Sequence, residues 1–207
     1  MMRRPRRATY RTGRVFVISS PSGGGKTTVV ERLQRRAPRL VRSVSVTTRP
    51  PRLGERRGRD YRFVSRGVFA RMKRSGQLLE WAKVHGAYYG TPKRPIVQAV
   101  ARGRDALLSI DVQGARKVRR LLGSQAVLIF LLPPSRAALR QRLRRRHTES
   151  AQAITQRLAV AAREVACARW YDYAVVNDRL SETVKQVKAI VMATGGRVPR
   201  RRKGTSG

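Results

Sequence analysis

A glycine-rich turn near the start of the chain ends in a lysine and two threonines: Ser20-Pro21-Ser22-Gly23-Gly24-Gly25-Lys26-Thr27-Thr28. Consecutive glycines carry no Cβ atoms, so their backbone N–H groups can converge on a bound anion. Lys26 adds a positive charge, and the Thr27 hydroxyl can ligate Mg²⁺ at the positive end of the following helix. These properties are typical of a nucleoside triphosphate site.

The spacing matches the phosphate-loop pattern G-x-x-x-x-G-K-[ST], with Ser20 in place of the first glycine. An apolar run at 15–18 precedes the turn, and a helical pattern at 29–33 follows it. The alternative, an ordinary glycine-rich loop with a solvated lysine, does not account for this strand-to-helix context. The pattern therefore predicts triphosphate binding, but it leaves the reaction open.

A second group of residues predicts another phosphate-bearing substrate. Arg49 and Arg52 stand on either side of two prolines that stiffen the turn, and a guanidinium fork pairs well with phosphate oxygens. Tyr61 and the pair Tyr88-Tyr89 add phenolic donors, although core packing explains tyrosines nearly as well. The two arginines could therefore grip one phosphate from two sides.

The elements that position these residues follow from the apolar runs at 15–18, 106–110, 126–132 and 173–176. A helical pattern follows each run, which predicts an α/β fold with a parallel sheet flanked by helices. A phosphate loop directly after the first strand then lies at the carboxyl edge of the sheet, where open α/β folds bind nucleotides.

Two segments depart from this alternation. Residues 43–95 contain short alternating segments broken by prolines and glycines, which predicts a small β-rich insert. Residues 139–158 are crowded with arginines and contain one acid, Glu149, so they are either a solvated helix face or a mobile lid over the phosphates. The remaining core consists of 13–42, 96–138 and 159–194, between basic tails, 1–12 and 195–207, that we expect to be disordered.

Composition limits the compartment. The chain has 207 residues, 41% of them hydrophobic, and no apolar run long enough to cross a membrane. Its basic start lacks the apolar stretch of a secretory signal, and a lone cysteine, Cys167, excludes an intramolecular disulfide. We therefore expect a cytoplasmic protein; its oligomeric state is not predicted.

The formal net charge of +37 predicts attraction to polyanions. The basic ends, residues 1–14 and 197–207, hold only 11 of the 48 lysines and arginines, so most of the surplus lies in the body. A general arginine bias on solvated faces explains it better than a dedicated nucleic-acid site, because no aromatic residues are interleaved as a stacking platform. Weak, non-specific association with nucleic acid is the expectation.

The segment from Ser43 to Val64 resembles the guanylate kinase signature, Ser-Val-Ser-x-Thr-Thr-Arg-x-Pro-Arg-x-Gly-Glu-x-x-Gly-x-Asp-Tyr-x-Phe-Val. The resemblance spans roughly residues 13–194 and continues in four short motifs: Glu80-Trp81-Ala82, Tyr88-Tyr89-Gly90-Thr91, Ile110-Asp111-Val112-Gln113-Gly114 and Tyr171-Asp172-Tyr173-Ala174-Val175-Val176-Asn177-Asp178. It implies a P-loop nucleoside monophosphate kinase core with a GMP-binding insert and a helical lid. The implied activity is ATP-dependent phosphorylation of GMP and dGMP with Mg²⁺, in purine nucleotide metabolism.

The resemblance also implies roles for single residues. The residues that it implies for binding the GMP phosphate are Arg49, Arg52, Tyr61 and Tyr89. Those that it implies for contacting the guanine base are Ser45, Glu80, Thr91 and Asp111. Residues 20–28 and Asn177 are implied to bind ATP, and Thr27 is implied to ligate the metal ion. The implied lid arginines are Arg142, Arg146 and Arg157. The implied catalytic residues are Lys26, Arg49 and these three lid arginines.

Two other classes of protein remain possible from sequence. A non-catalytic guanylate-kinase-like module binds a peptide or phosphopeptide through the insert, but such modules typically lack a working phosphate loop, and this chain has Gly25-Lys26-Thr27. A nucleic-acid-binding protein explains the charge but not Glu80 or the Tyr88-Tyr89 pair.

Overall fold

The computed structural model describes residues 12–84, 86–144 and 151–195. Its larger sheet has the strand order β2-β7-β1-β8-β9, and every pairing in it is parallel. The strands are β1 (Val15–Ser19), β2 (Val41–Arg42), β7 (Ala106–Ser109), β8 (Ala126–Leu132) and β9 (Tyr173–Val176). The predicted parallel α/β core is confirmed; β2 was not predicted, because two residues carry no periodic signal.

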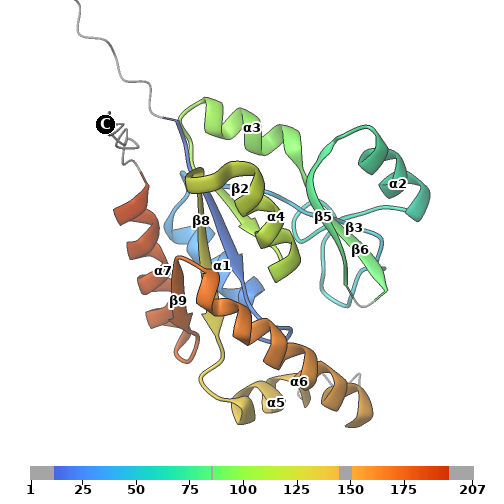
Figure 1. The fold of residues 1–207 in the computed structure, drawn as a ribbon, viewed down its shortest axis with the longest axis vertical. Helices are drawn as coiled ribbons and strands as arrows, with labels where there is room; N and C mark the ends of the chain where they lie inside the picture. The colour runs from blue at the N-terminus through green and yellow to red at the C-terminus, as the bar shows by residue number, and fades with distance from the viewer. Residues whose placement is uncertain (1–11, 85, 145–150, 196–207) are drawn as a thin grey trace, which may run out of the picture.

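Helices cover both faces of this sheet because its central strands are apolar on both sides (Figure 1). Alternate residues of β1 divide the core: Phe16 and Ile18 pack with α1 (Lys26–Arg36) and α7 (Leu180–Thr194). Val15 and Val17 pack on the other side with α3 (Lys93–Ala101) and α4 (Val112–Leu122). The period of two along β1 thus sets the layers.

A second sheet projects to one side of the core, with the strand order β4-β3-β6-β5 (Figure 1). The strands are β3 (Val46–Thr47), β4 (Arg62–Phe63), β5 (Leu78–Val84) and β6 (Ala87–Pro92). Helix α2 (Arg66–Arg74) covers it through Phe69 and Met72, which pack on Val46. The Ser65 hydroxyl caps α2 by accepting the Val68 N–H at 3.2 Å.

Helices α5 (Arg136–Arg144) and α6 (Ala151–Ala166) lie at the opposite end from α3 (Figure 1). They share an apolar cluster of their own: Leu139, Leu143, Ile154, Leu158 and Ala161. Two 3₁₀ turns, η1 (Gly123–Gln125) and η2 (Cys167–Trp170), complete the elements described. Arg146 and most of both predicted tails, residues 1–11 and 196–207, lie outside the described residues.

Within the described ranges, no helix has both the length and the apolar character that crossing a bilayer requires.

Candidate active site

The glycine-rich turn joins β1 to α1 and forms a cradle of backbone N–H groups. Gly23 and Gly25 have φ values of 83° and 84°, in the left-handed region that glycine adopts without strain. Gly25 is the N-cap residue of α1 and supplies no side chain to cap it. The first N–H groups of α1 therefore lack the usual side-chain acceptor, which is how phosphate-binding helix ends are built.

Contacts from distant parts of the chain fix this phosphate loop from behind. The Asn177 side-chain amide donates to the Gly24 carbonyl at 2.7 Å, and the Arg142 Nη2 group donates to the Asn177 carbonyl at 2.8 Å. A Cβ at Gly23 would lie 2.8 Å from a Leu143 methyl group, so α5 packs directly on the loop. The side-chain amide of Asn177 is thus engaged with the backbone of the phosphate loop.

One nitrogen beside this loop lacks a partner. Arg142 Nη1 is buried and has no hydrogen-bond acceptor among the described residues, and it lies 3.9 Å from where a Gly25 Cβ would stand. A buried guanidinium N–H group without an acceptor is energetically costly. An anion bound at the phosphate loop would supply that acceptor to Arg142 Nη1.

Lys26 points to the carboxyl edge of the sheet, where its Nζ donates to the Ile110 carbonyl at 2.8 Å. Burial lowers the pKa of Lys26, while the carboxylates of Asp111, Glu164 and Glu80 act to raise it. The ammonium group is thus held by the Ile110 carbonyl, with three carboxyl groups nearby that favour its charged form. A bound triphosphate can take over the contact that the carbonyl makes.

Glu80 is the buried carboxylate of the second sheet, with 5% of its surface exposed. It pairs across β5 and β6 with Thr91, whose hydroxyl donates to Glu80 Oε1 at 2.6 Å. Burial raises the pKa of Glu80 to about 7 against the hydrogen bond from Thr91, and Asp111 adds to the increase. Gly114 makes room for the group, since a Cβ there would lie 2.6 Å from Glu80 Oε2.

The predicted phosphate clamp forms a connected cluster. Arg49 donates to both oxygens of Glu55, at 2.9 and 2.8 Å, and its Nε donates to the Tyr89 hydroxyl at 3.2 Å. Its guanidinium group lies 5.5 Å from the centre of the Tyr61 ring. Arg52 is exposed nearby, with its backbone N–H bound to Glu55 at 2.7 Å.

A single cavity of about 230 Å³ joins the phosphate loop to these groups. Apart from residues 20–28, its predicted lining residues are Ser45, Arg52, Tyr61, Glu80, Tyr89, Asp111 and Arg157. Arg49, Thr91, Arg142 and Asn177 do not line it, and each instead contacts a group described above. Lining residues that were not predicted are Val84, Gly90, Ser109, Ile110 and Glu164.

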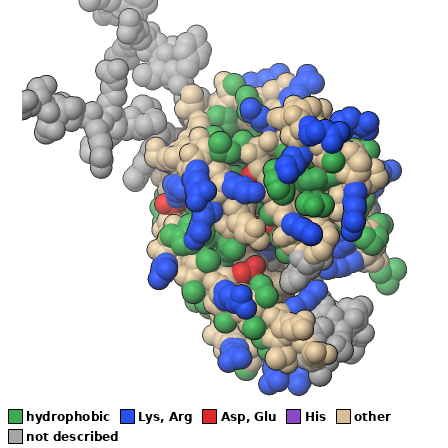
Figure 2. Space-filling view, turned by 45° about the vertical axis from the view of Figure 1, so that its right-hand side comes forward, with side chains coloured by type: hydrophobic (Ala, Val, Ile, Leu, Met, Phe, Trp, Pro, Cys, Tyr) green, Lys and Arg blue, Asp and Glu red, His purple; other side chains and the backbone are tan. Residues whose placement is uncertain are grey.

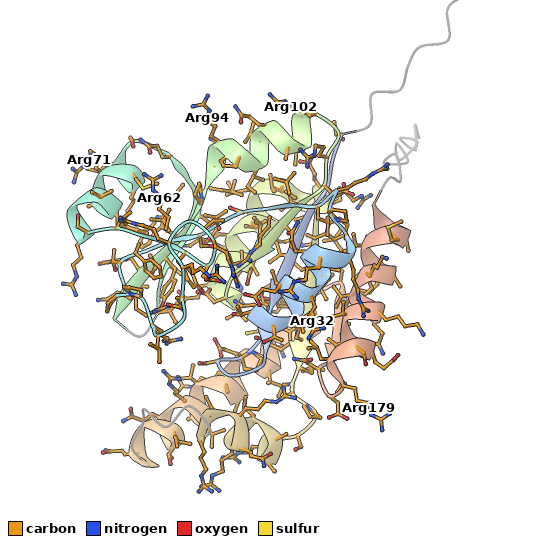
Figure 3. The ribbon with its side chains drawn as sticks, turned by 180° about the vertical axis from the view of Figure 1, so that it is seen from behind. Arg32, Arg62, Arg71, Arg94, Arg102 and Arg179 are labelled. Atoms are coloured by element: carbon orange, nitrogen blue, oxygen red, sulfur yellow. The ribbon has the colours of Figure 1, made fainter. Side chains whose placement is uncertain are left out.

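Most of the charge lies away from this cavity. Lysine and arginine side chains spread over the face seen in Figure 2, with few acids among them. Arginines also project outward from several elements in Figure 3: Arg32, Arg62, Arg71, Arg94, Arg102 and Arg179. Among the acids in the described part of the chain, six accept hydrogen bonds from backbone N–H groups: Glu55, Asp60, Asp105, Asp111, Glu164 and Asp172.

Comparison with known proteins settles the family. The family model described as guanylate kinase matches residues 12–194. The chain belongs to the guanylate kinase family. It is 43% identical to a guanylate kinase of Carboxydothermus hydrogenoformans, over 87% of this chain and 88% of that protein. It is 47% identical to one of Thermosynechococcus vestitus, over 90% and 97% of the two chains.

A solved structure agrees with these sequence comparisons. The crystal structure of guanylate kinase from Anaplasma phagocytophilum matches with a TM-score of 0.75 and 37% identity, covering 90% of this chain and 88% of that one. Both the family resemblance and the predicted fold are therefore confirmed. As a guanylate kinase, the chain is an enzyme of nucleotide metabolism.

Proposed function

We propose that this guanylate kinase transfers the γ-phosphoryl group of ATP to GMP, and equally to dGMP, inside the 230 Å³ cavity. The observation that carries the proposal is the continuity of that cavity from the phosphate loop to the buried Glu80. In a chain with 48 cationic residues and 11 acids, a carboxylate buried opposite a phosphate loop needs a partner with N–H donors. Guanine has such donors.

On the triphosphate side, the N–H groups of Gly23 and of residues 25–28 take the ATP phosphates, while the Gly24 N–H donates to the Pro21 carbonyl at 2.8 Å. Lys26 leaves the Ile110 carbonyl for the outer phosphates. Arg142 Nη1 finds its acceptor there, and Arg157 lies along the same cavity. Arg146, on the segment outside the described residues, is proposed as a third cation of a lid at 139–158. The acceptor phosphate is already anionic, so these groups act by position and charge.

Mg²⁺ accompanies ATP in this proposal, and the residues present fit it. Thr27 lies exposed in the first turn of α1 on the cavity wall, as a phosphate-loop hydroxyl ligand must. In the described ranges, no three acid, histidine or cysteine side chains are arranged to hold a metal ion by themselves. Mg²⁺ in sites of this kind takes most of its ligands from phosphates and water. When bound, the ion neutralises charge on the phosphates.

On the GMP side, Arg49, Arg52, Tyr61 and Tyr89 hold the phosphate, with Glu55 fixing Arg49. Glu80 accepts from guanine N1–H and the 2-amino group, with Ser45, Thr91 and Asp111 around the base. Adenine has an acceptor at N1 and no 2-amino group, so a buried carboxylate would face it unpaired. None of these contacts involves the 2′-hydroxyl, so dGMP is treated as GMP is.

The test is an ADP-release assay with GMP, dGMP, AMP, CMP and UMP as acceptors, each with Mg²⁺ and with the metal chelated. Turnover of GMP and dGMP that depends on Mg²⁺, with little turnover of AMP, is the expected result. Equal rates with AMP and GMP would contradict the assignment of the base pocket, and rates that survive chelation would contradict the role given to Thr27.

GMP affinity is expected to rise with pH until about pH 7. Free Glu80 has its pKa raised to about 7 by burial. Guanine N–H groups need the ionised carboxylate, so bound GMP lowers this pKa and binding releases a proton at lower pH. Affinity then weakens by up to about tenfold for each pH unit below the pKa of the free enzyme. Calorimetry between about pH 5.5 and pH 8.5 measures the slope.

The matched control for this titration is Glu80→Gln, which retains only the titration of the GMP phosphate, with its second pKa near 6. The same slope in both proteins would show that Glu80 does not titrate on binding.

We also propose a cytoplasmic location and only weak, non-specific association with nucleic acid. The outward arginines in Figure 3 lie on several elements rather than along one groove, which favours charge-driven contact without base readout. Affinity for a random RNA is expected to fall linearly on a log–log plot, by a factor on the order of a thousand between about 0.05 and 0.2 M salt. A gel-shift series measures it, and sequence-selective binding that survives the higher salt would refute it.

A further inference from the structure

Glu164 is a cavity-lining carboxylate that the nucleotide contacts above leave unused. It lies near the end of α6, half-buried, and its Oε2 accepts the Ser22 N–H of the phosphate loop at 3.2 Å. Burial raises its pKa against that hydrogen bond and the charge of Lys26. A negative charge beside a triphosphate site repels the ligand, so its presence in a chain with 11 acids calls for a function.

The position of Glu164 on its helix gives that function. Arg157 precedes it by seven residues, two helical turns, so both side chains lie on one face of α6, about 10 Å apart along the axis. Both line the cavity. Any rotation or slide of α6 against the loop therefore moves the Arg157 guanidinium relative to the phosphates.

The packing around α6 supports the same reading. Helices α5 and α6 are joined by their own apolar cluster, separate from the two clusters of the main sheet. Leu143 of that cluster packs on Gly23, an apolar contact that does not fix direction. The hydrogen bond from Ser22 to Glu164 is directional, and it ties α6 to the residue next to Gly23.

We propose that Glu164 is a positioning residue for phosphoryl transfer: by accepting the Ser22 N–H it fixes α6 against the phosphate loop and so places Arg157 over the transferring group. The inference rests on the proposed function. It requires an acceptor atom at this position and a cation at Arg157, and it does not require the negative charge of Glu164.

The experiment compares kcat and KM for ATP and GMP among E164A, E164Q, R157A and the double variant E164A/R157A, with E182A as control. Glu182 is an exposed acid in the first turn of α7. E164A is expected to lower kcat about tenfold or more, with KM for GMP unchanged. E164Q keeps kcat within about threefold, because its amide oxygen still accepts the Ser22 N–H. In the R157A background, E164A costs less than about twofold.

Each other outcome overturns the inference. If E164A keeps the wild-type kcat, Glu164 does not position Arg157 for phosphoryl transfer. If E164Q and E164A lower kcat equally, the effect comes from the charge of Glu164 rather than from its acceptor atom. If the losses in kcat from E164A and R157A are fully additive, Glu164 does not act through Arg157. If E164A does not fold, E164D replaces it, with a carboxylate one methylene too short to reach Ser22. Wild-type turnover of GMP, measured alongside, tests the proposed function separately; its absence overturns both.

Discussion

Replacing Lys26 by alanine is expected to lower kcat about a thousandfold, while GMP affinity changes by less than about twofold. Lys26 is a half-buried lysine in the phosphate loop, and its ammonium group donates to the Ile110 carbonyl. Charge that stabilises a transferring phosphoryl group inside a cavity is worth several powers of ten in rate. The GMP contacts proposed above come chiefly from the second sheet and its loops, so we expect them to persist without Lys26.

The binding measurement needs a pH well above 7. Lys26 helps to keep Glu80 ionised, so its loss raises the pKa of Glu80 and weakens GMP binding near neutrality by protonation alone. Calorimetry at about pH 8.5 removes that effect. Lys185→Ala on the exposed side of α7 controls for the loss of one positive charge. If GMP affinity falls together with kcat in a folded K26A protein, the two nucleotides do not occupy separate parts of the cavity.

Glu80→Gln is expected to reduce kcat/KM for GMP about a hundredfold or more and to leave AMP a poor substrate. The amide places an NH₂ group where guanine also presents donors, so two buried donors face each other. Leaving a buried polar group unpaired costs a binding pocket far more selectivity than losing an apolar contact does. Thr91 can still donate to the remaining oxygen, and the side chain keeps its size, so the fold is retained.

The measurement is kcat/KM for GMP and AMP, with Glu182→Gln as the matched loss of an exposed acid. A GMP rate in E80Q that stays within about threefold of wild type would remove Glu80 from the base pocket. A large gain with AMP would show that the new amide NH₂ group donates to adenine N1, so that the pattern of donors and acceptors at this one position is what excludes adenine.

The parts of the fold that could be predicted are those with local signals. Strands β1, β8 and β9 and the phosphate loop are short runs whose residue types specify them without distant contacts. Helix α2 was missed because the prolines and glycines around it favoured a β-rich reading of the segment. Its apolar positions, Phe69 and Met72, are too few to establish a helical period.

The supports of the site could not be predicted, because they join residues far apart in the chain. Ser22 and Glu164 are separated by 142 positions, and Gly24 and Asn177 by 153. Composition offered a partial signal: in a chain with only 11 acids, each acid is a candidate for a functional role. Asp172 and Asp105 show that the signal is mixed, since they accept the backbone N–H groups of Leu128 and Arg14, where strands β8 and β1 are anchored.

The arginines that project outward in Figure 3 change how often nucleotides arrive. ATP and GMP are anions, and a positive surface accelerates diffusional encounter by about ten to a thousandfold at low ionic strength. Departing ADP and GDP feel the same attraction, so capture and release respond to salt in opposite directions. Groups inside the cavity are screened much less. Ionic strength therefore changes the rates at which nucleotides bind to and leave this enzyme more than it changes the rate of the chemical step.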